Sequence, residues 1–215
     1  GGEGGAIRAI DSVVIATDCQ FTANRAALAS GGALWIQGGA HVFQDCSFAH
    51  NVSGDDGGAI FAESCQLVVR DSSFVSNDTG HDPHPGGALS FQGMPGAANQ
   101  SITLLRCLFR SNTGQFGGAV SLAGIGAVRD AICEHTAALG GQLSCGGGAV
   151  SAAAETTVNG CVFALNTAID QFSSGGGAIL GSPFIDRCTF VDNDATGGAT
   201  SVEGAGALRN SIVRG

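Results

Sequence analysis

Two segments of the sequence combine the side chains that metal binding and acid–base catalysis use, namely histidine with carboxylate and carboxylate with carboxylate. His81-Asp82-Pro83-His84-Pro85 could hold a metal ion on one loop, and Asp55-Asp56 could act as a catalytic pair. Two prolines interrupt the first segment and Gly57 follows the second, a composition typical of bends. We therefore expect a solvated loop and a polar bend, with no catalytic residue, no metal and no cofactor.

The eight cysteines are the third group of side chains with chemical potential. An even number of cysteines in a secreted chain invites disulfides. Five of them share one position in a recurring Cys-x-Phe-x-x-Asn motif, where a buried thiol would pack as a small hydrophobe and stacked side chains would give an awkward disulfide dihedral. These five are Cys19, Cys46, Cys107, Cys161 and Cys188. Cys65 and Cys145 fall outside this set and are better candidates for bonding or exposure.

These positions belong to an internal repeat, which is the first pattern to seek in any sequence. Gly-Gly-Ala recurs from Gly4 onward at spacings of 27, 26, 29, 31, 30, 29 and 21 residues, ending in a weaker copy at Gly197. The Cys-x-Phe-x-x-Asn motif keeps the same phase, although the fifth unit is degenerate, with Ala131-Cys133-Thr136. Its phenylalanines are Phe21, Phe48, Phe74, Phe109, Phe163 and Phe190. Its asparagines are Asn24, Asn51, Asn77, Asn112, Asn166 and Asn193.

The residue pattern within each unit predicts three short strands joined by bends. Alternate residues after Gly-Gly-Ala are apolar, as at Leu34 and Ile36, which is the period of a strand. Three strands in each unit predict an all-β chain, a right-handed parallel β-helix of about eight rungs stacked about 4.8 Å apart. Residues 1–215 then form a single domain in which equivalent side chains stack in columns. We expect the asparagines to take left-handed conformations and bond along their column, and the glycines to supply positive φ at another corner.

Composition excludes several classes of protein. The net charge of −9, with no lysine, disfavours binding to nucleic acid, because that affinity comes largely from lysine and arginine on phosphates. The 36 glycines argue against a helical protein, and they lack the three-residue period of collagen. Apolar runs stay well short of the ~20 residues of a membrane-spanning helix, so this chain is not expected to insert into a membrane.

The repeated Gly-Gly-Ala-Ile/Leu/Val corner with Phe-x-x-Asn resembles the repeat of the polymorphic outer-membrane protein family, which consists of surface-exposed bacterial β-helix proteins. The resemblance covers nearly the whole chain. It implies secretion, a β-helix fold, and an adhesive or structural role. We therefore expect a location outside the cell or on its surface and no enzymatic activity.

A glycan-binding or polysaccharide-cleaving β-helix is the alternative function. Its site would lie along the edge formed by the loops after Asn77, Thr136 and Asn166 and by the insertion from Gly93 to Gln100. Carboxylates converging near those loops would favour it, whereas scattered carboxylates favour the structural role.

Two kinds of partner contact follow from the repeat. Trp35 and Phe61 hold the same outward position on adjacent rungs, where they either grip a sugar ring or protein or are covered by a loop. The partner would be a glycan or protein on a cell surface, or a second copy of the chain. The end of the last unit would continue in phase into Gly1 of another copy, so the chain is either a piece of a longer solenoid or a subunit that stacks head to tail into a filament.

Overall fold

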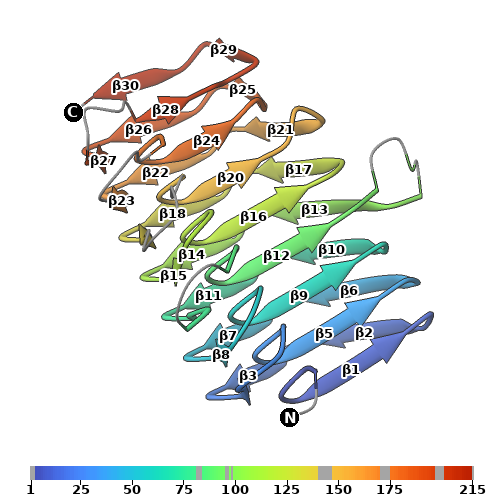
Figure 1. Ribbon diagram of the computed structural model, residues 1–215. Helices are drawn as coiled ribbons and strands as arrows, with labels where there is room; N and C mark the ends of the chain where they lie inside the picture. Colours follow the sequence, from blue (N-terminus) through green and yellow to red (C-terminus); the bar gives the residue numbers. More distant parts are fainter. Residues whose placement is uncertain are drawn as a thin grey trace.

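The computed structural model describes residues 3–80, 84–94, 97, 99–139, 147–169, 175–196 and 201–214. Within these ranges the chain contains strands and no helix. It winds as a right-handed β-helix from the N-terminal end at the bottom of Figure 1 to the C-terminal end at the top. Every strand pair is parallel, and the chain forms three sheets of eight strands each. The predicted all-β solenoid with three strands per rung is therefore confirmed.

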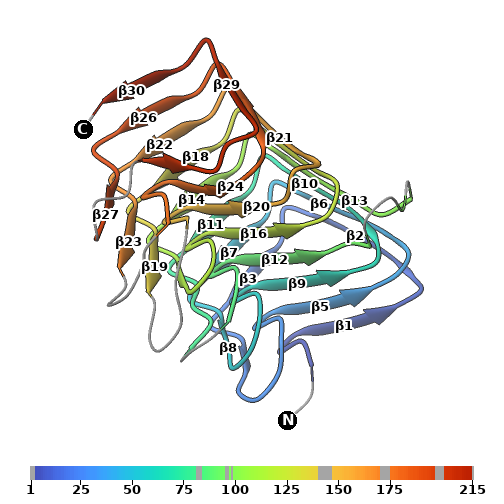
Figure 2. The ribbon, with the colours of Figure 1, turned by 45° about the horizontal axis from the view of Figure 1, so that its top comes forward.

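The three long sheets form the faces of the coil (Figure 2). Sheet A contains β1 (Ile7–Ile10), β5 (Leu34–Gln37), β9 (Ile60–Glu63), β12 (Leu89–Gln92), β16 (Val120–Ala123), β20 (Val150–Ala152), β24 (Ile179–Gly181) and β28 (Val202–Glu203). Sheet B contains β2 (Val13–Thr17), β6 (Ala40–Gln44), β10 (Gln66–Arg70), β13 (Ser101–Leu105), β17 (Gly126–Arg129), β21 (Thr156–Asn159), β25 (Phe184–Asp186) and β29 (Ala207–Arg209). Sheet C contains β3 (Gln20–Thr22), β7 (Ser47–Ala49), β11 (Ser73–Val75), β14 (Leu108–Arg110), β18 (Ile132–Glu134), β22 (Val162–Ala164), β26 (Thr189–Val191) and β30 (Ile212–Arg214).

Short strands after the asparagine column make a fourth narrow face that the sequence did not predict. They form a pair, β4 (Arg25–Ala26) and β8 (Val52–Ser53), and a sheet of four, β15 (Thr113–Gly114), β19 (Ala137–Leu139), β23 (Thr167–Ile169) and β27 (Asp194–Ala195). Single bridges through Asp78 connect the two groups. Each piece has only two or three residues because the chain then turns toward the Gly-Gly corner.

The core lies inside the coil, where one residue in two on each strand points inward. Leu34, Ile60 and Leu89 follow one another in sheet A and are fully buried. Phe43, Val69 and Leu104 do the same in sheet B, and the phenylalanines of the Cys-x-Phe motif fill sheet C. Because each rung repeats this arrangement, the apolar side chains form one continuous cluster along the axis.

The bends use left-handed backbone at three recurring positions. The first glycine of the corner has positive φ in the first six units, as at Gly57 (66°), and the residue after each sheet B strand has positive φ too, as at Asp71 (53°). At the asparagine bend the left-handed residue is the one before the asparagine, such as Ser76 (54°) before Asn77. The expectation that the asparagines themselves are left-handed is therefore wrong, because each amide is needed in a fixed orientation along its column.

The second glycine of the corner is required by close packing. A Cβ atom on Gly58 would overlap the carbonyl oxygen of Gly87 on the next rung and lie 2.6 Å from the backbone nitrogen of Asp78. Only a residue without a side chain lets two rungs approach this closely. The repeated Gly-Gly pair therefore combines a conformational role with a steric one.

The strand register of the eighth unit differs from the prediction. If the Gly-Gly-Ala copy at Gly197 formed the corner, Ser201 would pair with Leu180, whereas the structure pairs Leu180 with Glu203. The predicted corner at 197–200 lies outside the described residues. The outward column that begins at Arg8 therefore ends on Glu203, two residues later than predicted.

Candidate functional site

The phenylalanine and asparagine columns lie in the interior of the coil. Phe48 stacks on Phe21 at 4.8 Å and on Phe74 at 4.7 Å between ring centroids, with interplanar angles of 5° and 6°. Phe74 stacks on Phe109 at 4.8 Å, and Phe163 stacks on Phe190 at 5.0 Å. In the fifth unit Cys133 takes the place of phenylalanine, beside Phe109 and Phe163.

Asn77 shows how an asparagine inside the column bonds to its neighbours on both sides. The Asn77 amide nitrogen donates to Asn112 Oδ1 and to the Phe48 carbonyl, both at 3.0 Å. Its oxygen accepts from the backbone and amide nitrogens of Asn51, both at 3.0 Å. At the degenerate position the Thr136 hydroxyl donates to Asn166 Oδ1 at 2.7 Å. The column is a structural support, since Asn77 and its neighbours Asn51 and Asn112 are fully buried.

The cysteines of the repeat are free thiols. They precede the sheet C strands and point inward, where each Sγ lies within hydrogen-bonding distance of the carbonyl two residues earlier, as Cys46 does with Gln44 (3.2 Å). Burial raises the pKa of Cys107 to about 11. Cys65, expected to be bonded or exposed, is instead a buried free thiol whose pKa burial raises to about 12, and Cys145 lies outside the described residues. Protonated, buried thiols are poor nucleophiles and metal ligands.

Trp35 and Phe61 are stacked, but they are not exposed. Their ring centroids lie 6.3 Å apart with an interplanar angle of 19°, and each residue retains only 7% of its accessible surface. The Arg8 guanidinium lies 5.0 Å from the Trp35 ring. Further along the same column, Gly175, just ahead of a Gly-Gly corner, lies close to Leu180. Of the two alternatives for Trp35 and Phe61, exposure to a partner and coverage, their burial contradicts exposure.

One polar cluster gathers the two segments that the sequence presented separately. His84 Nδ1 lies 2.9 Å from Asp55 Oδ1 and 3.7 Å from Asp56 Oδ1. One ligand atom from each side chain lies within 4.8 Å of the others. Asp55 and Asp56 precede β9, and His84 precedes β12 on the next rung. His81 and Asp82 lie outside the described residues, so the predicted loop is described only from His84 onward.

Asp56 is the electrostatically unusual member of this cluster. Burial, the Asp55 charge and a hydrogen bond with Asp55 raise the pKa of Asp56 to about 7, against a donated hydrogen bond from Gln92 that lowers it. Gln92 Nε2 holds Asp56 Oδ2 at 2.9 Å, which leaves Oδ1 facing His84. The cluster has the side chains to hold a cation or to exchange a proton near neutral pH.

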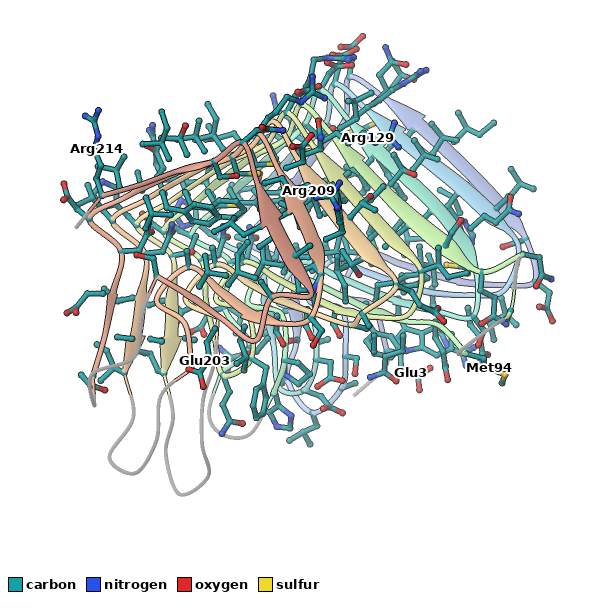
Figure 3. The ribbon with its side chains drawn as sticks, turned by 90° about the horizontal axis from the view of Figure 1, so that it is seen from above. Glu3, Met94, Arg129, Glu203, Arg209 and Arg214 are labelled. Atoms are coloured by element: carbon teal, nitrogen blue, oxygen red, sulfur yellow. The ribbon has the colours of Figure 1, made fainter. Side chains whose placement is uncertain are left out.

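A second candidate site lies on the outer face of sheet B. An open hollow of about 600 Å³ is lined by Arg129, Asp130, Thr157, Asn159, Phe184 and Arg187. Arg209 borders it, with its guanidinium carbon 5.3 Å from the Phe184 ring centroid. Arg129 and Arg209 project on the same outer side of the coil in Figure 3. Three of the nine basic residues of an acidic chain therefore surround one exposed aromatic ring.

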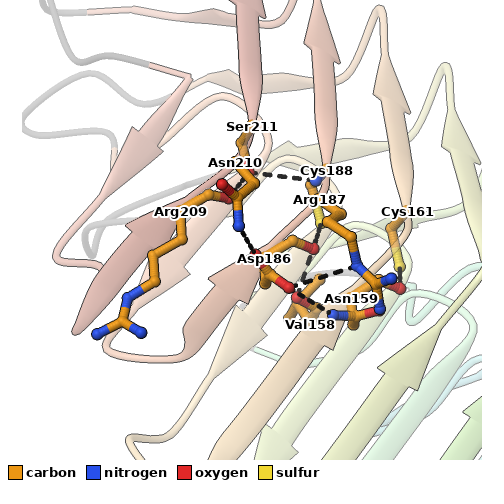
Figure 4. Close-up of polar contacts among 9 residues, drawn as sticks. All are labelled: Val158, Asn159, Cys161, Asp186, Arg187, Cys188, Arg209, Asn210 and Ser211. Carbon is orange, nitrogen blue, oxygen red and sulfur yellow. Dashed lines mark hydrogen bonds and ion pairs between the residues drawn. The ribbon is translucent and has the colours of Figure 1, made fainter.

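Asp186 organises the arginine side of this hollow (Figure 4). Its oxygens accept from Asn159 at 3.2 Å and from Asn210 at 2.8 Å, and Arg187 Nε lies 3.4 Å away. Arg187 also donates to Asn159 Oδ1 at 2.7 Å. This network holds the Arg187 guanidinium toward the hollow while two-thirds of its side chain stays exposed (68%). Such an arrangement can bind an anion.

The sequence contained a signal for this hollow that we did not use. Arg129, Asn159, Asp186 and Arg209 are partners in adjacent strands, and each is the last residue of its sheet B strand. Comparing this residue and the one after it from rung to rung would have placed Arg129, Arg187 and Arg209 near one another on the last four rungs.

Comparison with known proteins supports the class of protein that this fold defines, a repeat-built parallel β-solenoid. Residues 45–63 match the model of the Chlamydia polymorphic membrane protein repeat. The matched stretch contains Cys46, Phe48 and Asn51 and ends in the strand after the next Gly-Gly-Ala corner, so the resemblance drawn from these motifs is confirmed. It supports a surface-type β-helix. Searches of curated proteins and of solved structures gave no match. Among the described residues no helix is long and apolar enough to cross a membrane.

Proposed function

We propose that this chain is an extracellular, cell-surface β-helix with an adhesive and structural role and no enzymatic activity, and that it binds anionic glycan through the hollow on sheet B. The repeat match and the continuous solenoid support the surface role. The single observation that carries the binding role is the hollow itself, where Arg129, Arg187 and Arg209 surround Phe184.

The chemistry of the hollow fits a sugar acid or a sulfated sugar. Guanidinium groups form paired hydrogen bonds with carboxylate and sulfate oxygens. Phe184, which is 38% exposed, offers an apolar surface of the kind on which sugar rings pack. The site is shallow and open, and it spans the successive strands β17, β21 and β25. A chain of sugars could therefore lie across the rungs.

The arrangement supports binding more than cleavage. Asp186, a carboxylate beside the hollow, accepts hydrogen bonds on both oxygens from Asn159 and Asn210. Both oxygens of Asp186 therefore serve to position neighbouring side chains rather than to act as a catalytic acid or base.

Asp55 and Asp56 do converge on His84 in the loop after Asn77, at the edge where the alternative function would place its site. This cluster lies on another face and an earlier rung than the hollow, so it does not contribute to glycan binding there.

Removing two arginines should separate this function from the fold. We expect the double variant Arg129→Gln, Arg187→Gln to bind polygalacturonate or heparin at least about tenfold more weakly than wild type, because a hydrogen bond to a charged group contributes about 1.5–3 kcal/mol. Arg70→Gln is the matched control, because Arg70 is exposed in the same column of sheet B outside the hollow. Titration calorimetry measures the affinities, and dextran, a neutral glycan, serves as the reference ligand.

Equal binding by the double variant and wild type would contradict the proposed binding site. Depolymerisation of polygalacturonate by the purified chain would instead establish the glycan-cleaving alternative.

Head-to-tail stacking of copies is the second candidate role. Within the described chain β1, β2 and β3 have a strand neighbour on one side only, as do β28, β29 and β30. Exposed apolar side chains mark both edges, with Val13 and Ile15 on β2 and Ile212 and Val213 on β30. Further rungs of a longer chain would cover the same edges. If copies stack, light scattering should show mass rising with concentration and electron microscopy should show fibres, whereas a monomer at high concentration would overturn this role.

A further inference from the structure

The cluster of Asp55, Asp56 and His84 joins two consecutive rungs. Its carboxylates stand directly before the corner at Gly57, and its imidazole stands before the corner at Gly86. Backbone bonds hold these corners in register, since the Gly57 nitrogen donates to the Pro85 carbonyl at 3.1 Å. The His84 carbonyl accepts from the Gln115 nitrogen at 2.9 Å and from the Thr79 hydroxyl at 3.3 Å. The three side chains are thus brought together by backbone that is itself fixed.

We propose that Asp55, Asp56 and His84 bind a divalent transition-metal cation, with Zn²⁺ as the best match. Zinc binds imidazole nitrogen and carboxylate oxygen at about 2.0–2.2 Å in tetrahedral geometry, so two of its ligand atoms lie about 3.3–3.6 Å apart. The distances from His84 Nδ1 to the two carboxylates, 2.9 and 3.7 Å, lie on either side of that separation, so small side-chain rotations would reach it. One imidazole with two carboxylates is a donor set for zinc and its neighbours in the first transition row, whereas Ca²⁺ and Mg²⁺ take oxygen ligands.

Each ligand atom has a reason to face the ion. Gln92 Nε2 holds Asp56 Oδ2, so Asp56 presents Oδ1 toward His84. Asp55 Oδ1 already faces His84 Nδ1. The site is accessible to an ion from solution, because the side chains of Asp55 and His84 are about half and one-quarter exposed (49% and 23%).

Gln115 is a second observation, on the rung next to His84. It occupies the column of Asp55 and His84 one rung further on, as shown by its backbone bond to the His84 carbonyl. Gln115 is 3% exposed, and both polar atoms of its amide are buried without a hydrogen-bond partner in the described part of the chain. A buried amide normally has partners, and leaving it without them costs about 1–3 kcal/mol. A cation with bound water next to His84 would supply a polar partner in this column.

The bound cation would fasten two corner segments together. It would neutralise two adjacent carboxylates and link the residues before β9 to those before β12. Because metal binding to the folded chain adds to its stability, loading should raise the thermal unfolding temperature.

Titration of the purified full chain with Zn²⁺ tests the proposal. We expect one ion per chain, and Asp56→Asn and His84→Gln should each weaken binding by more than the roughly 10–100-fold that loss of an outer-shell partner costs. His135→Asn is the matched control, because His135 is exposed at a bend and lies outside the cluster. Circular dichroism without metal verifies that each variant keeps the fold.

Cobalt(II) distinguishes this site from the cysteines, since its absorption spectrum separates thiolate ligands from nitrogen and oxygen ligands. Nitrogen and oxygen coordination that disappears in folded His84→Gln would support the site. Three results would each overturn it: no Zn²⁺ binding by wild type, a thiolate spectrum, or equal affinity in wild type and both variants. The glycan-binding variants carry intact Asp55, Asp56 and His84, so failure there leaves this test unaffected.

Discussion

Asn77→Ala should lower the free energy of unfolding by about 4 kcal/mol, because it leaves buried polar groups without partners at about 1–3 kcal/mol each. The Asn51 backbone nitrogen would lose its acceptor, and the Phe48 carbonyl would lose the amide that bonds it. The Asn51 amide would lose a second bond. Water cannot replace these contacts easily, since Asn51 and Asn77 are fully buried. Urea unfolding followed by circular dichroism measures the effect.

The chain contains its own control for this prediction. Thr136 occupies the asparagine column and bonds to Asn166 through its hydroxyl, so the fold tolerates one shorter side chain there. Thr136→Asn would restore an amide that can hydrogen-bond to Asn112, the preceding member of the column. We expect the free energy of unfolding to rise by about 1 kcal/mol, the net value of one hydrogen bond. Equal stability of Asn77→Ala and wild type would show that the column contributes little.

The architecture could be predicted from the sequence because every rung repeats the same constraints. A single Phe or Gly-Gly pair carries little information, but Phe21, Phe48 and Phe74 in one phase require those side chains to stack. The register then follows, and the structure pairs Phe48 with Phe21 and with Phe74. Repetition turns a weak local preference into a strong constraint, since each rung can bury its apolar face only on its neighbours.

The outer surface could not be predicted in the same way. Strand alternation places Trp35 and Phe61 on the outside of sheet A, which the pairing of β5 with β9 confirms. Alternation does not show what lies above them, and the residues before each Gly-Gly corner have no regular period. Their path depends on loop lengths, which vary between rungs. The sequence therefore left exposure and coverage of this pair as alternatives.

The cluster of Asp55, Asp56 and His84 illustrates the same limit. Both of its segments were visible, but Gly86 follows Asn77 by nine residues, whereas Gly57 follows Asn51 by six. Counting from the asparagine leaves the position of His84 open. Counting back from the glycine places Asp55 and His84 in one column, because the corner resets the register on each rung. The eighth unit was misplaced because it has no clear corner in the paired region from which to count.

Phe74→Ala should lower the free energy of unfolding by about 3–5 kcal/mol, the usual cost of replacing a buried phenylalanine with alanine. Phe74 is fully buried and stacks on Phe48 at 4.7 Å and on Phe109 at 4.8 Å. The substitution therefore removes both stacking contacts and leaves a cavity. The surrounding strands cannot close it readily, because β11 is bonded to β7 on one side and to β14 on the other.

Phe184→Ala is the matched control, since Phe184 also lies in a sheet strand but is 38% exposed on the outer face. We expect this variant to change stability by less than about 1 kcal/mol, because little apolar area is lost from the core. Because solenoid stability is a sum over neighbouring rungs, Phe74→Ala should unfold the rungs around β11 first, and hydrogen exchange should show protection falling there before it falls at β26. Equal urea midpoints for Phe74→Ala and Phe184→Ala would contradict the inference that the stacked column holds the coil together.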